Sequence, residues 1–177
     1  FHLSLQSGCT ETLKRMHRHY TADEYADIVS DIRRIFDNPS ITTDIMVGFA
    51  GETEEEFEKS LNFSDYISFA KVHVFSYSRR KGTVADKMPD QVDPKVKNLR
   101  SKLMIEHTDN KRKEFLLSQV GRVEGVLFEI KNRSGFYEGY TKNYTPVYVK
   151  SDNDLIGKII PVKLMEAEKD YCIGVIE

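Results

Sequence analysis

Three clusters of polar and glycine residues follow apolar, β-branched segments in the first half of the chain. They are Gln6-Ser7-Gly8, Gly48 to Thr53, and Ser76 to Arg80. In parallel α/β folds the functional groups gather at the carboxyl ends of strands, because loops there vary without disturbing the core. One such cluster is typical of a turn. Three of them at successive strand ends predict a shared ligand pocket.

Asp44 and the loop that follows it bear on what such a pocket could bind. Asp44 interrupts the apolar segment 41–49, and a buried carboxylate needs hydrogen-bond partners because its desolvation is costly. It either holds a neighbouring loop or contacts a cofactor or substrate. Gly48 and Gly51 precede an expected helix N-terminus, where free amides can meet an anion. The loop lacks the GxGxxG pattern, so its sequence alone is only a weak indication of phosphate binding. A doubly wound domain that binds a nucleotide through residues 48–53 is the alternative.

The histidines and cysteines predict neither a metal site nor a nucleophile. His17 and His19 have no third ligand at a suitable spacing, which favours a solvated pair. Cys9 and Cys172 lie far apart, which gives neither a disulfide framework nor a CxxC-type metal site. Neither cysteine has a histidine nearby in sequence to activate it. We therefore expect no catalytic residue in this chain and a reducing, cytoplasmic environment.

Strand and helix signals alternate around the three clusters. The chain opens on an alternating segment that already reads as a strand, so we expect it to begin inside a fold. Thr21 with Glu24 and Thr53 with Glu56 form capping boxes, each of which begins a helix. The expected strands are 3–5, 41–49 and 71–77. Helical crossovers between them predict parallel strands side by side in chain order, with 3–5 at one edge.

The second half of the chain has a different pattern. Asp93-Pro94 begins a long charged helix that reaches about Ser118, with Val96, Leu99 and Leu103 on one face. Five short strands separated by turn residues follow, at 123–131, 136–141, 146–150, 157–164 and 171–176. Such regular spacing predicts a small β-barrel. The expected domains are therefore 1–115, of the α/β class, and 116–177.

Composition and charge exclude some classes of protein. Of the 177 residues, 40% are hydrophobic and 31% charged, and no apolar run approaches a membrane span of ~20 residues, which excludes a membrane protein. The net charge is -2, but residues 79–115 hold 11 Lys or Arg against 6 Asp or Glu. This basic belt is either a solvated helix face or a phosphate-facing surface.

Several ordered motifs resemble those of the radical SAM methylthiotransferases. They are Leu3-Ser4-Leu5-Gln6-Ser7-Gly8, Leu13 to Met16, Arg18-His19-Tyr20, Thr42 to Phe49 with Gly51-Glu52-Thr53, and Tyr77 to Thr83. Residues from about 116 onward resemble the TRAM domain, a small barrel implicated in tRNA binding. The resemblance covers nearly the whole chain. It implies a partial parallel (βα) barrel of the radical SAM type, followed by an antiparallel, OB-like barrel.

The resemblance also implies a reaction and its site. The full-length enzyme would cleave S-adenosylmethionine to a 5′-deoxyadenosyl radical and insert a methylthio group at C2 of a modified adenosine beside the anticodon. Its partners would be tRNA, an electron donor and a sulfur source. The candidate cofactor contacts are Gln6, Ser7, Asp44 and Gly48. Arg79 and Arg80 would face the adenosine substituent or a phosphate, because a guanidinium fork suits a carboxylate.

Two departures from the family matter. Ala50 stands where the family has Pro in Gly-Phe-Pro-Gly-Glu-Thr, which removes no functional group. The family binds two 4Fe-4S clusters, one through a CxxxCxxC motif and one through cysteines of an N-terminal domain, and this chain contains neither set. We therefore expect it to ligate neither cluster and to be inactive by itself.

The substrate branch is indicated by Tyr77 to Thr83 and by His73-Val74-Phe75. Both segments resemble the branch that acts on threonylcarbamoyladenosine in tRNA. Other branches act on isopentenyl-adenosine in tRNA or on an aspartate of a ribosomal protein. A rival from another class is a non-catalytic RNA-binding module.

The first half of the expected barrel carries the candidate RNA contacts. Residues 119–150 hold five Lys or Arg against three Asp or Glu, whereas 151–177 hold three against six. The candidates are Lys131, Arg133, Lys142, Tyr144 and Lys150. They alternate with Tyr137, Tyr140 and Tyr148, and such a mixture of cations and aromatics can grip a backbone and stack unpaired bases. The alternative is that the tyrosines fill the barrel core.

Overall fold

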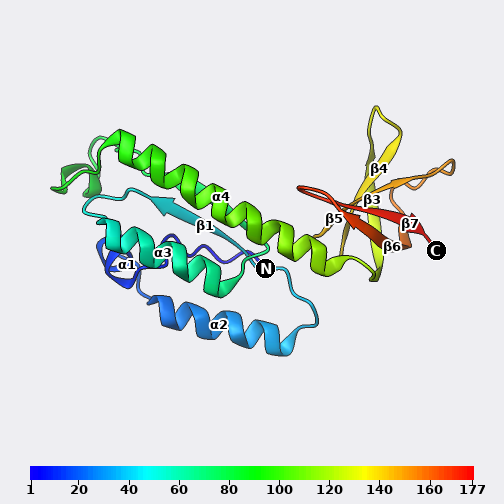
Figure 1. Ribbon diagram of the computed structural model, residues 1–177, viewed down its shortest axis with the longest axis horizontal. Helices are drawn as coiled ribbons and strands as arrows, with labels where there is room; N and C mark the ends of the chain where they lie inside the picture. Colours follow the sequence, from blue (N-terminus) through cyan, green and yellow to red (C-terminus); the bar gives the residue numbers. More distant parts are fainter. The chain divides into compact units, whose positions relative to one another are not determined.

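The computed structural model describes all 177 residues, which form two compact units, 1–111 and 112–177 (Figure 1). Helices α1 (Thr10–Arg15), α2 (Ala22–Ile35) and α3 (Glu54–Ile67), strands β1 (Thr42–Val47) and β2 (Lys71–Ser76), and the short 3₁₀ helix η1 (Ala85–Lys87) belong to the first unit. The division falls within α4 (Pro94–Gln119). No helix is both long and apolar enough to cross a bilayer.

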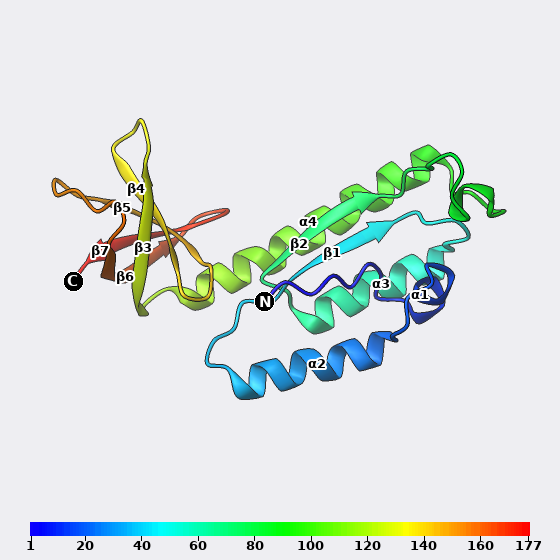
Figure 2. The ribbon, with the colours of Figure 1, turned by 180° about the vertical axis from the view of Figure 1, so that it is seen from behind.

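The sheet of the first unit is parallel. β1 and β2 pair with Thr42 opposite Lys71 and Val47 opposite Ser76. The opening segment 1–6 runs along the other edge of β1, as Figure 2 shows, through parallel bridges from His2 to Thr42 and from Gln6 to Ile45. The predicted order of three parallel segments, with the first at one edge, is confirmed.

The opening segment differs from a regular strand because it carries one residue more than its partner. Four residue steps separate His2 from Gln6, whereas three separate Thr42 from Ile45. The buried Thr43 hydroxyl accepts the Leu5 amide proton at 2.9 Å and donates to the Leu3 carbonyl at 2.6 Å. It thereby satisfies backbone groups that the bulge removes from the ladder. The predicted regular strand at 3–5 is wrong in this respect.

The two predicted capping boxes are confirmed and determine where α2 and α3 begin. In each, a threonine hydroxyl accepts the amide proton of a glutamate three residues on, and the glutamate carboxylate accepts the threonine amide proton. Both helices then pack apolar side chains against one face of the sheet. The core there includes Leu5, Tyr25, Val29, Ile41, Ile45, Val47, Phe57, Ile67, Phe69 and Met104.

The apolar row along α4 is not its buried face. Val96, Leu99 and Leu103 are exposed, while Arg100, Met104 and Thr108 form the buried row at spacings of four. The reason is that Arg100 finds acidic partners in the first unit, as described below, and places Met104 one turn on in the core. The side of α4 that packs is therefore set by the partners of Arg100 and not by the apolar row.

The second unit contains the predicted five-stranded barrel. Its strands are β3 (Val123–Lys131), β4 (Phe136–Thr141), β5 (Pro146–Lys150), β6 (Ile159–Ala167) and β7 (Cys172–Ile176). They close in the order β3-β4-β5-β7-β6, with β5 and β7 parallel and every other pair antiparallel. A small closed barrel of five strands with one long-range pairing is an OB-like arrangement. Val126, Phe128, Val147, Val162 and Leu164 fill its interior.

The account of the bulge makes a prediction about Thr43. Thr43→Val keeps the side-chain volume but leaves the Leu5 amide without an acceptor in a buried place, which costs about 1–3 kcal/mol. We expect faster hydrogen exchange of the β1 amides, measured by NMR on the whole chain. Thr42→Val is the matched control, because the Thr42 side chain lies on the partly exposed face. Equal effects of the two substitutions would contradict this role of the Thr43 hydroxyl.

Candidate functional site

A polar cluster lies on the face of the sheet that the helices do not cover. The Asp44 carboxylate accepts the Ser4 hydroxyl proton at 2.8 Å through Oδ2, and His2 Nε2 lies 3.3 Å from the same oxygen. The expectation that Asp44 needs hydrogen-bond partners is confirmed. Its other oxygen, Oδ1, makes no hydrogen bond within the chain, and the side chain is 26% exposed. Asp44 can therefore accept a further proton from a hydroxyl or an ammonium group.

Sequence reasoning missed the neighbours of Asp44 on this face. His2 and Ser4 contact it directly, and the His73 ring lies 6.2 Å from that of His2. The signal was available, because alternate residues of extended segments share a face. Parallel pairing places His73 directly opposite Asp44.

Gln6 and Ser7 lie at the carboxyl end of the opening segment but have different roles. The Gln6 backbone is bonded to β1 through both its amide and its carbonyl, at 2.8 Å each. Its φ of 71° is unusual for a residue with a side chain. Ser7 is fully buried, and its hydroxyl accepts the Cys9 amide proton at 3.2 Å. Ser7 therefore shapes the turn into α1, and Gln6 is the partly exposed member of the pair.

The loop after β1 is built around Gly48. Its φ is 72°, and a Cβ there would lie 2.2 Å from Lys97 Cγ, so only glycine fits. The Gly48 amide donates to the Glu52 carboxylate at 2.6 Å. This amide is therefore used within the loop, and the predicted backbone contact to a ligand would have to come from the Gly48 carbonyl.

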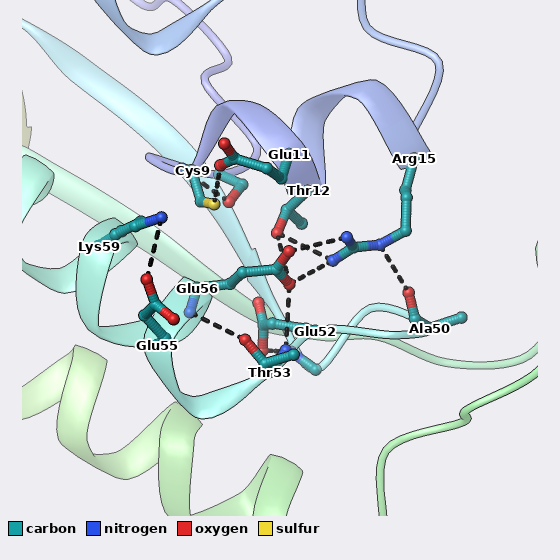
Figure 3. Close-up of polar contacts among 12 residues, drawn as sticks. Cys9, Glu11, Thr12, Arg15, Ala50, Glu52, Thr53, Glu55, Glu56 and Lys59 are labelled. Carbon is teal, nitrogen blue, oxygen red and sulfur yellow. Dashed lines mark hydrogen bonds and ion pairs between the residues drawn. The ribbon is translucent and has the colours of Figure 1, made fainter.

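Arg15 holds the same loop from the side of α1 (Figure 3). Its guanidinium pairs with the Glu56 carboxylate, and Nε donates to the Ala50 carbonyl at 3.3 Å. Burial would raise the pKa of Glu56, but hydrogen bonds from Arg15 and from the Thr53 amide outweigh it, and the pKa is lowered. Glu56 thus stays ionised and joins the start of α3 to α1.

The loops after β1 and β2 lie together. Tyr77 donates its amide to the Val47 carbonyl at 2.9 Å, and Gly51 donates to the Asp90 carbonyl at 2.8 Å. The rings of Phe49 and Tyr77 meet edge to face at 5.0 Å. The structure therefore brings two of the three predicted clusters into contact, and Gln6 bonds to β1 beside them.

The two arginines of the second loop are in different situations. Arg79 is engaged by Asp86, with Nε 3.0 Å from its carboxylate and a terminal nitrogen 2.7 Å from its carbonyl. The Arg80 side chain is exposed and makes no hydrogen bond or ion pair within the chain. Arg80 is therefore the arginine whose guanidinium can meet a ligand without first breaking an ion pair.

A cavity of about 460 Å³ opens elsewhere in the first unit. It lies between α1, the start of α2 and α3, and its lining includes Gly8, Cys9, Glu11, Lys59 and Phe63. Of the predicted site clusters, only Gly8 contributes to it. The predicted shared ligand pocket is not this cavity.

Both cysteines are buried packing residues. Cys9 donates to the Glu11 carboxylate at 3.0 Å, and burial, together with this bond, raises its thiol pKa. Burial raises the pKa of Cys172 to about 11. A 4Fe-4S cluster takes several thiolate ligands, and no group of three or more His, Cys, Asp or Glu side chains is placed to hold a metal. The chain's residues therefore do not fit either cluster.

The outer face of β4 and β5 carries a row of aromatic side chains. Tyr148 stacks on Tyr171 at 4.0 Å and 13°, and the Phe136 ring lies 6.4 Å from that of Tyr148. Lys150 lies over the Phe136 ring at 4.8 Å. Phe136 and Tyr171 were missed by sequence reasoning, because their position beside Tyr148 depends on the strand order.

The predicted RNA contacts lie at both ends of β4. Lys131 is the last residue of β3, Arg133 lies in the turn between β3 and β4, and Lys150 is paired opposite Phe136. Lys142 and Tyr144 lie at the turn after β4, and five residue steps of strand between these ends span about 17 Å. Tyr144 is 77% exposed, with its ring 5.5 Å from that of Tyr140.

Tyr137 is a correction to the predicted surface. It is 3% exposed and packs with Phe128 in the barrel core, so it cannot stack a base. Lys131 covers it, with the ammonium 4.5 Å from the Tyr137 ring centroid and donating to the hydroxyl at 3.1 Å. The alternative that tyrosines fill the core holds for this residue.

Comparison with known proteins identifies both units. Residues 1–64 match the Radical SAM superfamily and residues 117–176 match the TRAM domain. The threonylcarbamoyladenosine tRNA methylthiotransferase of Bacillus subtilis is 39% identical over 177 residues, which are 98% of this chain and 39% of the relative. The tRNA-2-methylthio-N6-dimethylallyladenosine synthases of Pelotomaculum thermopropionicum and Clostridium botulinum are 38% and 39% identical, over 99% and 98% of the chain.

The chain spans about two fifths of the length of these relatives. Its residues 1–64 are part of a radical SAM domain, and its C-terminal barrel is a TRAM domain. The chain therefore contains part of a radical SAM domain and a TRAM domain, and over nearly its whole length it is similar to part of the tRNA methylthiotransferases.

Proposed function

We propose that this chain is part of a tRNA methylthiotransferase that modifies C2 of N6-threonylcarbamoyladenosine beside the anticodon. The observation that carries the proposal is the similarity, over nearly the whole chain, to enzymes of this type, with radical SAM and TRAM segments in order. The relatives include enzymes named for two different adenosine substituents. The choice between these substrates therefore rests on the residues of the site.

The loop after β2 favours the threonylcarbamoyl group. That group ends in a carboxylate, whereas a dimethylallyl group is apolar and uncharged. Arg80 offers an exposed guanidinium with no partner in the chain, and Arg79 is oriented beside it by Asp86. A planar, permanently charged guanidinium suits a carboxylate and gains nothing from an apolar substituent.

The uncovered face of the sheet supports the proposed binding of S-adenosylmethionine. Asp44 Oδ1 is open to a hydroxyl or ammonium donor, both of which this cofactor carries. Gln6 lies beside it at the end of the opening segment, and Ser7 and Gly48 shape the adjacent turns. S-adenosylmethionine would supply the radical chemistry when bound. The clusters, the electron donor and the sulfur source would be held by other parts of the protein, and we expect this part alone to be inactive.

The TRAM barrel is proposed to hold tRNA through β4 and β5. OB folds bind oligonucleotides on the face of their second and third strands, which correspond to β4 and β5 here. Phe136, Tyr148 and Tyr171 present rings on that side, with cations at both ends of β4. Stacking contributes about 1–3 kcal/mol per base. Such an RNA surface is equally expected of a non-catalytic module, so it does not by itself argue for the enzyme.

Cations of the TRAM barrel should set the salt dependence of tRNA binding by this chain. Replacing Lys131, Arg133 and Lys142 by alanine should reduce the slope of log K against log salt concentration by about two. The reason is that each phosphate contact contributes roughly 0.7 to 0.9 to this slope. Fluorescence anisotropy with a labelled tRNA transcript measures the slope. The control with the same change of charge replaces Lys158, Lys163 and Lys169. An unchanged slope in the first variant, or an equal change in the control, would place the RNA surface elsewhere.

Arg80 should determine substrate choice by the full-length enzyme. Arg80→Ala should lower kcat/KM for tRNA bearing threonylcarbamoyladenosine by roughly tenfold or more, because a hydrogen bond to a charged group is worth about 1.5–3 kcal/mol. Lys81→Ala, the adjacent cation, is the control and should change it little. Steady-state assays with both types of modified tRNA measure the effect. Faster modification of dimethylallyladenosine by the unchanged enzyme would refute the proposed substrate.

A further inference from the structure

We propose that Arg100 of α4 is a positioning residue that sets the conformation of the loop 48–53. The proposal rests on the function proposed above, because its kinetic consequence concerns that reaction. Arg100 is 5% exposed and donates from one terminal nitrogen to both the carbonyl and the carboxylate of Glu52, at 2.9 Å each. The other terminal nitrogen donates to the Glu54 carboxylate at 2.9 Å.

Glu52 connects this arginine to the end of β1. The same carboxylate oxygen accepts the Gly48 amide proton at 2.6 Å and the Arg100 proton. The Glu52 side chain is 1% exposed, and burial raises its pKa despite these two donors. A single buried carboxylate thus links the first residue of the loop to the helix that covers it.

The pair is costly, which argues for a role other than stability. A buried ion pair often contributes no more than apolar side chains of the same volume would. Here the cost is greater, because Arg100 Nε is buried and has no hydrogen-bond partner. The pair does orient the loop, because one terminal nitrogen of the guanidinium bonds both the backbone carbonyl and the side-chain carboxylate of Glu52.

Lys97, one turn earlier, acts on the same region. Its aliphatic stem occupies the space that a side chain at position 48 would need. Its ammonium donates to the Tyr77 carbonyl at 3.1 Å, at the end of β2. The first turns of α4 therefore hold the ends of both strands, and Arg100 provides the buried, charged part of this contact.

The structural part of the test uses this chain alone. Arg100→Gln leaves Glu52 buried without its cation and could unfold the unit, so the principal variant is the double substitution of Glu52 by Gln and Arg100 by Met. It removes both charges and keeps an acceptor for the Gly48 amide. We expect hydrogen exchange of the loop amides to accelerate at least tenfold, while core amides of β1 keep their protection. Unchanged exchange in the loop would overturn the proposal.

The kinetic part uses the full-length enzyme. We expect the double variant to raise KM for S-adenosylmethionine at least tenfold with kcat within about threefold, and Arg100→Lys to recover part of the loss. The control is Glu54→Gln, because the Glu54 side chain is 66% exposed and lies outside the buried pair; it should change KM less than twofold. An unchanged KM in the double variant, or an equal change in the control, would overturn the proposal. If the unaltered enzyme modifies no tRNA, the proposed function fails, and hydrogen exchange alone decides the role of Arg100.

Discussion

The buried ion pair between Glu52 and Arg100 is the constraint on which the loop 48–53 and the buried side of α4 depend. An ionised carboxylate with 1% of its side chain exposed needs hydrogen-bond donors, and here the Gly48 amide and the guanidinium both donate to Oε2. The pair requires Arg100 on the buried side of α4, where the Lys97 stem in turn leaves room only for glycine at position 48. Arg15 and Glu56 secure the same loop from α1, so ionic contacts hold it from two sides.

The sheet divides structural from functional residues. One face of β1 and β2 packs against α2 and α3, while the other keeps Asp44 and its polar neighbours uncovered within this chain. This division is possible because successive side chains of an extended segment point to opposite faces of the sheet. Thr43 is an example, because its two neighbours in β1 lie on the uncovered face while its own side chain is buried. The Thr43 hydroxyl bonds backbone groups of the bulged opening segment, and Ser4 of the same segment bonds Asp44 on the other face. The same division occurs in the barrel, where Tyr137 is core and Tyr148 is surface.

Local signals in the sequence were sufficient for much of the fold and for little of the site. Capping boxes depend on residues three apart, and turn residues mark the five barrel strands, so both could be predicted. The pairing of Arg79 with Asp86 and the buried side of α4 depend on partners that only the folded chain brings near. The resemblance to the family indicated Ser7 and Gly48 as ligand contacts. In the structure the Ser7 hydroxyl and the Gly48 amide are hydrogen-bonded within their own turns, and such bonds cannot be read from a motif.

We propose that the protein containing this chain methylthiolates threonylcarbamoyladenosine in tRNA. The most direct test is mass spectrometry of the nucleosides of total tRNA from cells that carry or lack its gene. We expect 2-methylthio-N6-threonylcarbamoyladenosine to disappear when the gene is lost, unmethylthiolated N6-threonylcarbamoyladenosine to accumulate, and 2-methylthio-dimethylallyladenosine to stay unchanged. Loss of the dimethylallyl derivative instead, or no change in either nucleoside, would contradict the proposal.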